Sequence, residues 1–218
     1  MPTTRINGQN ILFIHIPKTG GTSVEHYLSR HGPINLKGGG YTQGMRCSPQ
    51  HLHLADLASL GALHDQDWTF TLVRHPVARI ISEYRYQMRK PKLLRSRMTF
   101  SIWLTYALSR RRLNPYYRDN HFRPQHEFVG PGVEVMRFED GVGGCLRRIT
   151  DQLGTPVPSS TIWQKNSQET SLLLSAGAIR AIEKVYARDF AEFKYKTDRS
   201  SLLAAGISLG MLSDSSGS

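Results

Sequence analysis

A short apolar run that ends in a glycine loop constrains the fold of this chain more than any other part of the sequence. Residues 10–16 are almost entirely apolar, which is typical of a parallel strand buried on both faces. A proline and two glycines within residues 17–21 end the run, and Thr22 or Ser23 can cap a helix that extends to about residue 30. The sequence therefore predicts a strand, a glycine loop and a helix in direct succession.

Strand and helix patterns alternate along the rest of the chain. This alternation predicts an α/β fold, a P-loop-like three-layer sandwich in which a mainly parallel sheet is flanked by helices. The 218 residues suit a single domain over residues 1–198, followed by a largely disordered tail over residues 199–218. The further predicted strands cover residues 68–73 and 133–138, and the further helices cover residues 55–63, 77–88, 100–108 and 142–153, with a longer one after a cap at Ser175.

The loop itself has the composition of an anion-binding site. Glycines let the backbone approach an anion, and the N–H groups of the following first helical turn point toward it. Lys18 adds a mobile positive charge. In the loops that bind ATP and GTP the Lys follows the last Gly, whereas here it precedes both glycines. That order argues against a P-loop nucleotide kinase, and an ordinary strand-to-helix turn is the other alternative.

A second candidate anchor follows the next predicted strand. Arg74 stands at the end of that strand, and Ser82 lies eight positions later in the next helix. The carboxyl ends of parallel strands meet at one edge of a sheet, so Arg74 and Lys18 are expected on the same rim. An Arg and a Ser placed in this way can hold a phosphate from two sides. Taken singly, either residue could instead belong to an ordinary surface.

These two segments resemble the cofactor motifs of the carbohydrate sulfotransferases. The matching strings are FIHIPKTGGTS at residues 13–23 and LVRHPVARIISEY at residues 72–84. The heparan sulfate 2-O- and 6-O-sulfotransferases and their bacterial counterparts are the most similar group. Residues 119–125 resemble a segment of the chondroitin-type members, and residues 137–140 resemble the strand that precedes a late helix in many sulfotransferases. The likeness extends over about residues 10–195.

The resemblance implies a reaction and a donor. These enzymes transfer a sulfuryl group from 3′-phosphoadenosine 5′-phosphosulfate (PAPS) to a hydroxyl of a carbohydrate and release 3′,5′-adenosine bisphosphate. By resemblance, Arg74 and Ser82 bind the 3′-phosphate of the donor, and Lys18 also stabilises the leaving phosphate. The 5′-phosphosulfate is then bound by Lys18, Thr19, Gly20, Gly21, Thr22 and Ser23.

The resemblance also points to a histidine as the general base. The enzymes of this group place their catalytic His between the two cofactor motifs, and here that stretch contains His51 and His53. A His-x-His pattern whose second member is the base assigns that role to His53 and a supporting or acceptor-positioning role to His51. His121 is the competing candidate. A metal pair of His51 and His53 is only weakly indicated, because no carboxylate or Cys stands at ligand spacing, and sulfuryl transfer requires no metal.

The positive charge of the chain is concentrated in one segment. The formal net charge is +11, and residues 85–123 contain eleven Lys and Arg against one Asp. This segment is either a solvated basic face or a wall for an anionic carbohydrate acceptor, on which Trp103, Tyr106, Tyr116 and Tyr117 could stack. The same ingredients suit a basic nucleic-acid-binding protein, although no nucleic-acid-binding motif accompanies them.

The remaining features concern location and partners. Cys47 and Cys145 form no disulfide framework, and the sequence has neither a cleavable signal pattern nor a run of the roughly 20 apolar residues that a membrane span needs. The Golgi members of the similar group carry an anchor. The expectation is therefore a bacterial cytoplasmic enzyme, or the catalytic domain of a truncated lumenal one.

Overall fold

The computed structural model describes residues 2–38, 40, 44–89, 98–156, 172 and 174–207. These residues fall into two compact units. The first takes its described residues from the stretches Met1–Arg74 and Pro115–Lys165, and the second takes them from His75–Asn114 and Asn166–Ser218. The first unit is therefore built from two separate parts of the chain. None of the described helices is long and apolar enough to cross a membrane.

A mixed four-stranded sheet forms the first unit. The strands β1 (Thr3–Ile6), β2 (Gln9–Ile14), β3 (Trp68–Val73) and β4 (Val133–Arg137) stand in that order. Strand β1 runs antiparallel to β2, whereas β2, β3 and β4 are parallel to one another. The carboxyl ends of these three strands consequently lie at one edge of the sheet. The α/β fold predicted from the sequence is confirmed.

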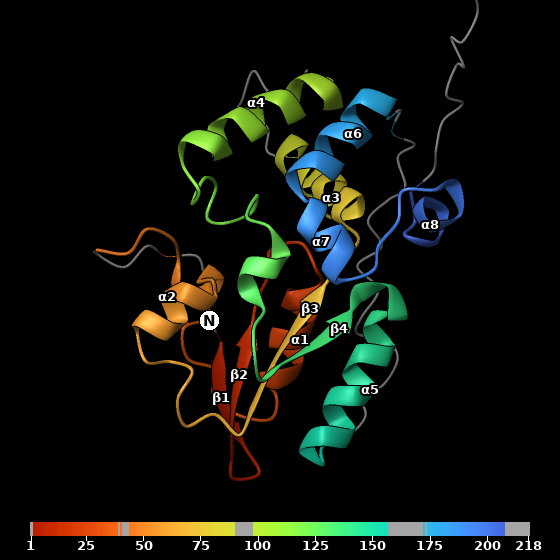
Figure 1. Ribbon diagram of the computed structural model, residues 1–218. Coiled ribbons are helices and arrows are strands. Elements are labelled where there is room, and N and C mark those ends of the chain that lie inside the picture. Colours follow the sequence, from red (N-terminus) through yellow and green to blue (C-terminus); the bar gives the residue numbers. More distant parts are fainter. Residues whose placement is uncertain are drawn as a thin grey trace, which may run out of the picture. The chain divides into compact units, whose positions relative to one another are not determined.

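The core of this unit lies between one face of the sheet and two helices. The helices α1 (Gly21–Leu28) and α5 (Val142–Leu153) lie along that face (Figure 1). Alternate residues of β2 and β3, among them Phe13 and Phe70, point into this core and are fully buried. Each such side chain contributes about 1.5–3 kcal/mol of transfer free energy on burial. Because the intervening residues of β2 are also buried, the strand has the doubly covered environment that its apolar run predicts.

The sequence prediction missed strand β1. It is joined to β2 by a two-residue hairpin, in which Asn7 and Gly8 both have positive φ angles, of 49° and 82°. An Asn-Gly pair is the most favourable sequence for such a turn, because both residues tolerate this left-handed conformation. That pair was the signal that could have revealed the strand.

Short helical elements also belong to the first unit. They are η1 (Pro49–His51), α2 (Leu54–Ser59), η3 (Gln125–Phe128) and η4 (Phe138–Asp140).

The second unit is helical. It contains α3 (Pro76–Met88), α4 (Phe100–Leu113), α6 (Ala176–Val185), α7 (Ala187–Glu192) and α8 (Arg199–Ala204). The side chain of Ser175 accepts a hydrogen bond from the backbone N–H of Ala178 and so caps α6, as predicted. Helix α8 lies in the first part of the predicted tail, where Asp198 caps it and Leu202 is buried. The later part of that tail, residues 208–218, is outside the described residues.

Candidate active site

The glycine loop between β2 and α1 is held by its own hydrogen bonds. Lys18 and Gly20 adopt positive φ angles of 70° and 90°, which turn the chain sharply into the helix. The hydroxyl of Thr19 donates to the carbonyl of Ile16 at 2.9 Å, and Thr19 is fully buried. The hydroxyl of Thr19, one of the predicted ligands of the donor, is therefore engaged inside the loop. Lys18 is half-buried.

Two aromatic rings leave no room for side chains at the glycines of the loop. A Cβ atom on Gly20 would stand 2.9 Å from the ring of Phe138, which follows β4. A Cβ atom on Gly21 would stand 2.4 Å from Nε2 of His15, which follows β2. These are distances at which a neighbouring ring must move. The loop therefore requires glycine at both positions for steric reasons, beyond any role in binding.

We expect Gly21→Ala to destabilise the protein by about 1–3 kcal/mol, the usual cost of an added methyl group in a packed site. Urea unfolding would measure this change. Gly144→Ala is the matched control, because a Cβ atom on Gly144 meets nothing within 4 Å and its helix, α5, should gain about 0.5–1 kcal/mol from alanine. Equal stability of the wild type and Gly21→Ala would show that the loop is more loosely packed than described.

Arg74 lies beside the loop, as the parallel sheet predicts. Its guanidinium Nη1 donates to the carbonyl of Lys18 at 3.4 Å, and its Cζ stands 4.2 Å from the ring centre of Phe138. The backbone N–H of Arg74 donates to Oε1 of Gln125, and Nε2 of Gln125 donates to the backbone carbonyl of Arg74, both at 2.8 Å. Residues that follow all three parallel strands thus meet at one rim.

The remaining predicted donor ligands lie on helices. Thr22 is exposed and Ser23 is half-buried in the first turn of α1, where hydroxyls and N–H groups can face an anion. Ser82 is half-buried on α3, in the second unit.

A buried ionic network lies beneath the loop. Nδ1 of His15 is 2.5 Å from Oε1 of Glu25, and the amide of Gln50 donates to both carboxylate oxygens of Glu25, at 2.8 and 3.0 Å. Burial by itself would raise the pKa of Glu25, but the hydrogen bonds and charge of His15, with the bond from Gln50, lower it. Glu25 is therefore a carboxylate, and it ties the segment around Gln50 to the loop.

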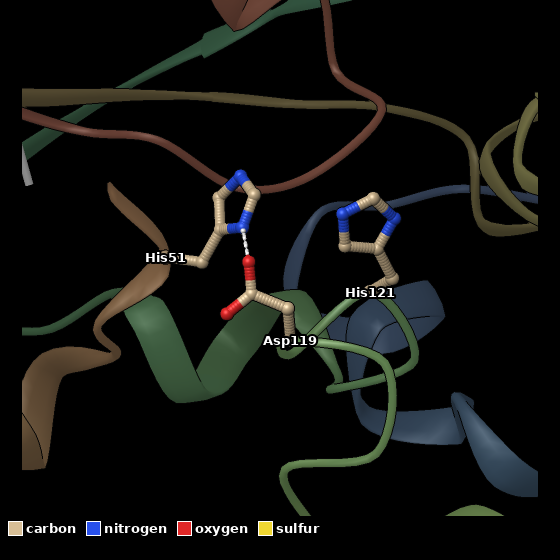
Figure 2. Close-up of side chains that lie close together, drawn as sticks. All are labelled: His51, Asp119 and His121. Atoms are coloured by element: carbon tan, nitrogen blue, oxygen red, sulfur yellow. Dashed lines mark hydrogen bonds and ion pairs between the residues drawn. The ribbon is translucent and has the colours of Figure 1, made fainter. Parts of the chain in front are cut away.

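His51, in this segment, is paired with Asp119 (Figure 2). Nδ1 of His51 is 2.7 Å from Oδ2 of Asp119, and Ser48 donates to the same carboxylate through its N–H at 2.6 Å and its hydroxyl at 2.8 Å. Burial by itself would raise the pKa of Asp119, but these hydrogen bonds outweigh it and lower that pKa to about 2. Because Asp119 is ionised, Nδ1 of His51 is the donor of the shared hydrogen bond.

The protonation of His51 follows from its surroundings. Burial lowers the pKa of His51, and the hydrogen bond to Asp119 only partly opposes this effect. The imidazole is consequently neutral at pH 7. Since its proton is on Nδ1, its Nε2 has a lone pair that can accept a proton.

Asp119 stands in a turn of unusual backbone conformation. Arg118, Asp119 and Asn120 have φ angles of 55°, 58° and 62°, so three consecutive non-glycine residues are left-handed. This conformation costs an ordinary residue such as Arg118 about 1–2 kcal/mol relative to the right-handed form, whereas Asp and Asn tolerate it better. The amide of Asn120 donates to the carbonyl of His51 at 2.8 Å, which attaches the turn to the histidine segment. Such strain concentrates at functional sites.

His121 completes a row of rings. The ring of His51 makes edge contacts with the rings of His15 and His121, at centroid distances of 5.2 and 5.1 Å. Figure 2 shows the carboxylate of Asp119 directed at His51, with His121 beside them. His51, Asp119 and His121 each offer one ligand atom, and these three atoms lie within 4.8 Å of one another, so this group could hold a divalent cation.

His53 is also paired with a carboxylate, but locally. Nδ1 of His53 is 2.5 Å from Oδ2 of Asp56, and the same oxygen accepts a hydrogen bond from the backbone N–H of His53 at 3.2 Å. The other oxygen, Oδ1, accepts a hydrogen bond from the hydroxyl of Tyr116 at 2.7 Å. Burial by itself would raise the pKa of Asp56, but the bonds from Tyr116 and His53 lower it. Because His53 precedes the first turn of α2, this pair caps that helix.

Comparison with known proteins now identifies the family. The profile of the sulfotransferase family matches residues 3–196. The chain belongs to the sulfotransferase family. Comparison with curated proteins and with solved structures yields no match. The prediction from the two motifs is confirmed at the level of the sulfotransferase family, which makes the protein a transferase of sulfuryl groups.

The sequence prediction missed two residues of the candidate site of this sulfotransferase, Asp119 and Ser48. Two signals were available for Asp119: it opens residues 119–125, which resemble a segment of the chondroitin-type members, and it stands in an Asp-Asn pair, whose residue types tolerate left-handed turns. No signal in the sequence pointed to Ser48, whose role depends on a contact with a residue 71 positions away.

The basic segment of this sulfotransferase, residues 85–123, is less uniform than the sequence suggested. Arg110 and Arg112 are exposed on α4, but Arg123 is buried, bonded to Asn120 and ion-paired with Glu127. Trp103 is also buried and donates to Gln87, so its ring is not available to stack on a sugar. Lys90, Lys92, Arg95 and Arg97 lie outside the described residues.

Proposed function

We propose that this sulfotransferase transfers a sulfuryl group from PAPS to a hydroxyl of a carbohydrate. The observation that supports this best is the convergence of the glycine loop and Arg74 on one rim, beside a neutral histidine. The glycine loop and Arg74 can bind an anionic donor, and the neutral histidine can remove the proton of the acceptor hydroxyl.

In this proposal, separate sets of residues bind the two phosphate-bearing ends of PAPS. Backbone N–H groups at Gly20 and Gly21, with Lys18 and the hydroxyls of Thr22 and Ser23, hold the 5′-phosphosulfate. Arg74 and Ser82 hold the 3′-phosphate. Family resemblance supports this assignment of ligands. The hydrogen bond from Arg74 to the carbonyl of Lys18 supports it further, because it places a residue assigned to the 3′-phosphate next to one assigned to the 5′-phosphosulfate.

Transfer requires a proton acceptor and a stabiliser of the leaving group. The hydroxyl oxygen of the carbohydrate forms a bond to sulfur as the bond between sulfur and the 5′-phosphate oxygen breaks. Negative charge therefore moves onto the leaving 3′,5′-adenosine bisphosphate. Lys18 stabilises that charge. The hydroxyl proton passes to a histidine, and no metal takes part.

Geometry favours His51 as that histidine, although the family pattern names His53. The ring of His51 touches His15, which packs directly under Gly21 of the loop. The ring of His53 instead contacts Tyr116 and Phe128, and its pairing with Asp56 is accounted for by the cap of α2. His51 is therefore connected to the glycine loop through a single residue, His15, whereas these ring contacts of His53 do not lead to the loop.

The acceptor in this proposal is an anionic glycan. The exposed arginines of α4, with the strong positive charge of residues 85–123, support a uronic-acid-containing or already sulfated substrate. Tyr117, half-buried and with its ring tilted against that of Phe122, is a remaining aromatic candidate for sugar contact.

Isothermal titration with 3′,5′-adenosine bisphosphate tests the proposed donor. We expect binding at sub-millimolar concentration and a loss of about 10- to 100-fold in affinity for Arg74→Ala, because a hydrogen bond to a charged group contributes about 1.5–3 kcal/mol. Arg148→Ala is the matched control, since Arg148 is an exposed arginine of α5 paired with Glu134. A screen of acidic and neutral glycans with radiolabelled PAPS, with and without EDTA, then tests transfer.

Other outcomes would support the competing functions. Salt-sensitive binding of DNA or RNA without binding of the bisphosphate would favour a nucleic-acid-binding protein. Magnesium-dependent turnover of ATP would favour a nucleotide kinase.

A further inference from the structure

The pairing of His51 with Asp119 has no local explanation. The two residues are 68 positions apart and come from two separate stretches of the first unit. In contrast, His53 and Asp56 are three positions apart and close the first turn of α2. A long-range contact that is held by a strained turn and buried beside the loop needs a reason beyond local structure.

We infer that Asp119 is a positioning residue of the transfer reaction and that it acts through His51. This inference rests on the proposed function and extends it. The carboxylate holds the proton of His51 on Nδ1, so Nε2 presents its lone pair to the acceptor hydroxyl. When Nε2 takes that proton, the imidazolium forms against an existing negative charge, which stabilises it.

The carboxylate is itself held in place. Ser48 donates its N–H to one oxygen of Asp119 and its hydroxyl to the other, which is the oxygen that faces His51. Asn120, the next residue of the turn, donates to the carbonyl of His51. Both partners are thus tied to the same backbone segment, and the ring orientation follows from these bonds.

Several charged or titratable groups face His51, and they determine the expected pH dependence. They are His15 after β2, Glu25 on α1, and Asp119 and His121 from the turn. Asp119 and Glu25 raise the pKa of His51, whereas burial and His15 lower it. Removal of the Asp119 charge therefore lowers the pKa of His51, and the acid limb of the rate profile should move to lower pH.

The test is Asp119→Asn, followed by two measurements. The first is ¹⁵N NMR of the His51 ring during a pH titration of the purified protein, with assignment by comparison with a His51 variant. We expect the wild-type ring to be protonated on Nδ1 when neutral, and the variant to lose that preference and titrate at lower pH. The second is the rate profile, in which kcat should fall about 10²- to 10⁴-fold, with little change in the affinity for 3′,5′-adenosine bisphosphate.

Two further variants separate positioning from folding. Ser48→Ala keeps the charge but removes one hydrogen bond to the oxygen that faces His51, so a smaller loss in the same direction is expected. Asp56→Asn makes the same substitution in the His53 pair and should leave the titration of His51 in place. An unchanged tautomer and titration of His51 in Asp119→Asn would overturn the inference. Expected NMR results with no transfer to any glycan would instead refute the proposed function.

Discussion

Lys18→Ala should lower the rate constant of sulfuryl transfer by about 10²- to 10³-fold, the usual effect of removing one donor that stabilises developing negative charge. Lys18 is half-buried in a loop whose backbone is left-handed at that residue, and its carbonyl accepts a hydrogen bond from Arg74. In the proposed reaction, charge on the leaving phosphate increases as the sulfuryl group departs, and Lys18 would interact with it most strongly at that stage. Single-turnover kinetics with radiolabelled PAPS would measure the effect.

Lys184→Ala is the control for this variant. Lys184 is exposed on α6, so its removal changes the net charge equally without touching the loop. If both variants lost activity to the same extent, the effect would be one of net charge. A Lys18→Ala protein with normal turnover would show that the leaving phosphate is stabilised by other groups.

The second large effect is expected at the base. His51→Ala should lower kcat by about 10²- to 10⁴-fold while binding of 3′,5′-adenosine bisphosphate stays close to normal, because in the proposed mechanism His51 removes the proton of the acceptor hydroxyl and does not bind the donor. Transfer assays and titration calorimetry on the same preparation would separate these effects. His53→Ala is the matched variant, two positions away.

The two histidine variants distinguish the candidates for the base. If His53→Ala abolished transfer and His51→Ala retained it, the family pattern would be right and the geometric argument wrong. If neither variant lost activity, His121, whose ring contacts His51, would be the next candidate.

Sequence patterns predicted the regular elements well where local rules apply. Strand β3 and helix α5 have the predicted bounds, because each is a clear apolar period between breaking residues. Helix α4 continues five residues past its predicted end, through a run of arginines. Positive charges are favourable at the carboxyl end of a helix, but the spacing of apolar residues, from which the helix was predicted, does not detect this interaction.

The site was predictable only where it follows from topology. Parallel strands bring their carboxyl ends together, so the proximity of Lys18 and Arg74 could be derived from the sequence. The partner of His51 could not, because it depends on a left-handed turn and a contact across 68 positions. The burial that lowers the pKa of His51 is also a property of the folded molecule alone.

The interrupted first unit has a consequence for how the protein is made. The loop and β3 lie in the amino-terminal stretch, whereas Asp119 and β4 arrive only after the intervening helices α3 and α4 have been synthesised. A nascent chain that has reached Asn114 contains the anion loop and His51, yet it lacks the carboxylate that orients the ring. Non-local pairing of this kind is slow to form. The proposed active site is therefore assembled late in biosynthesis, and a chain released early would contain the glycine loop and His51 without the carboxylate of Asp119.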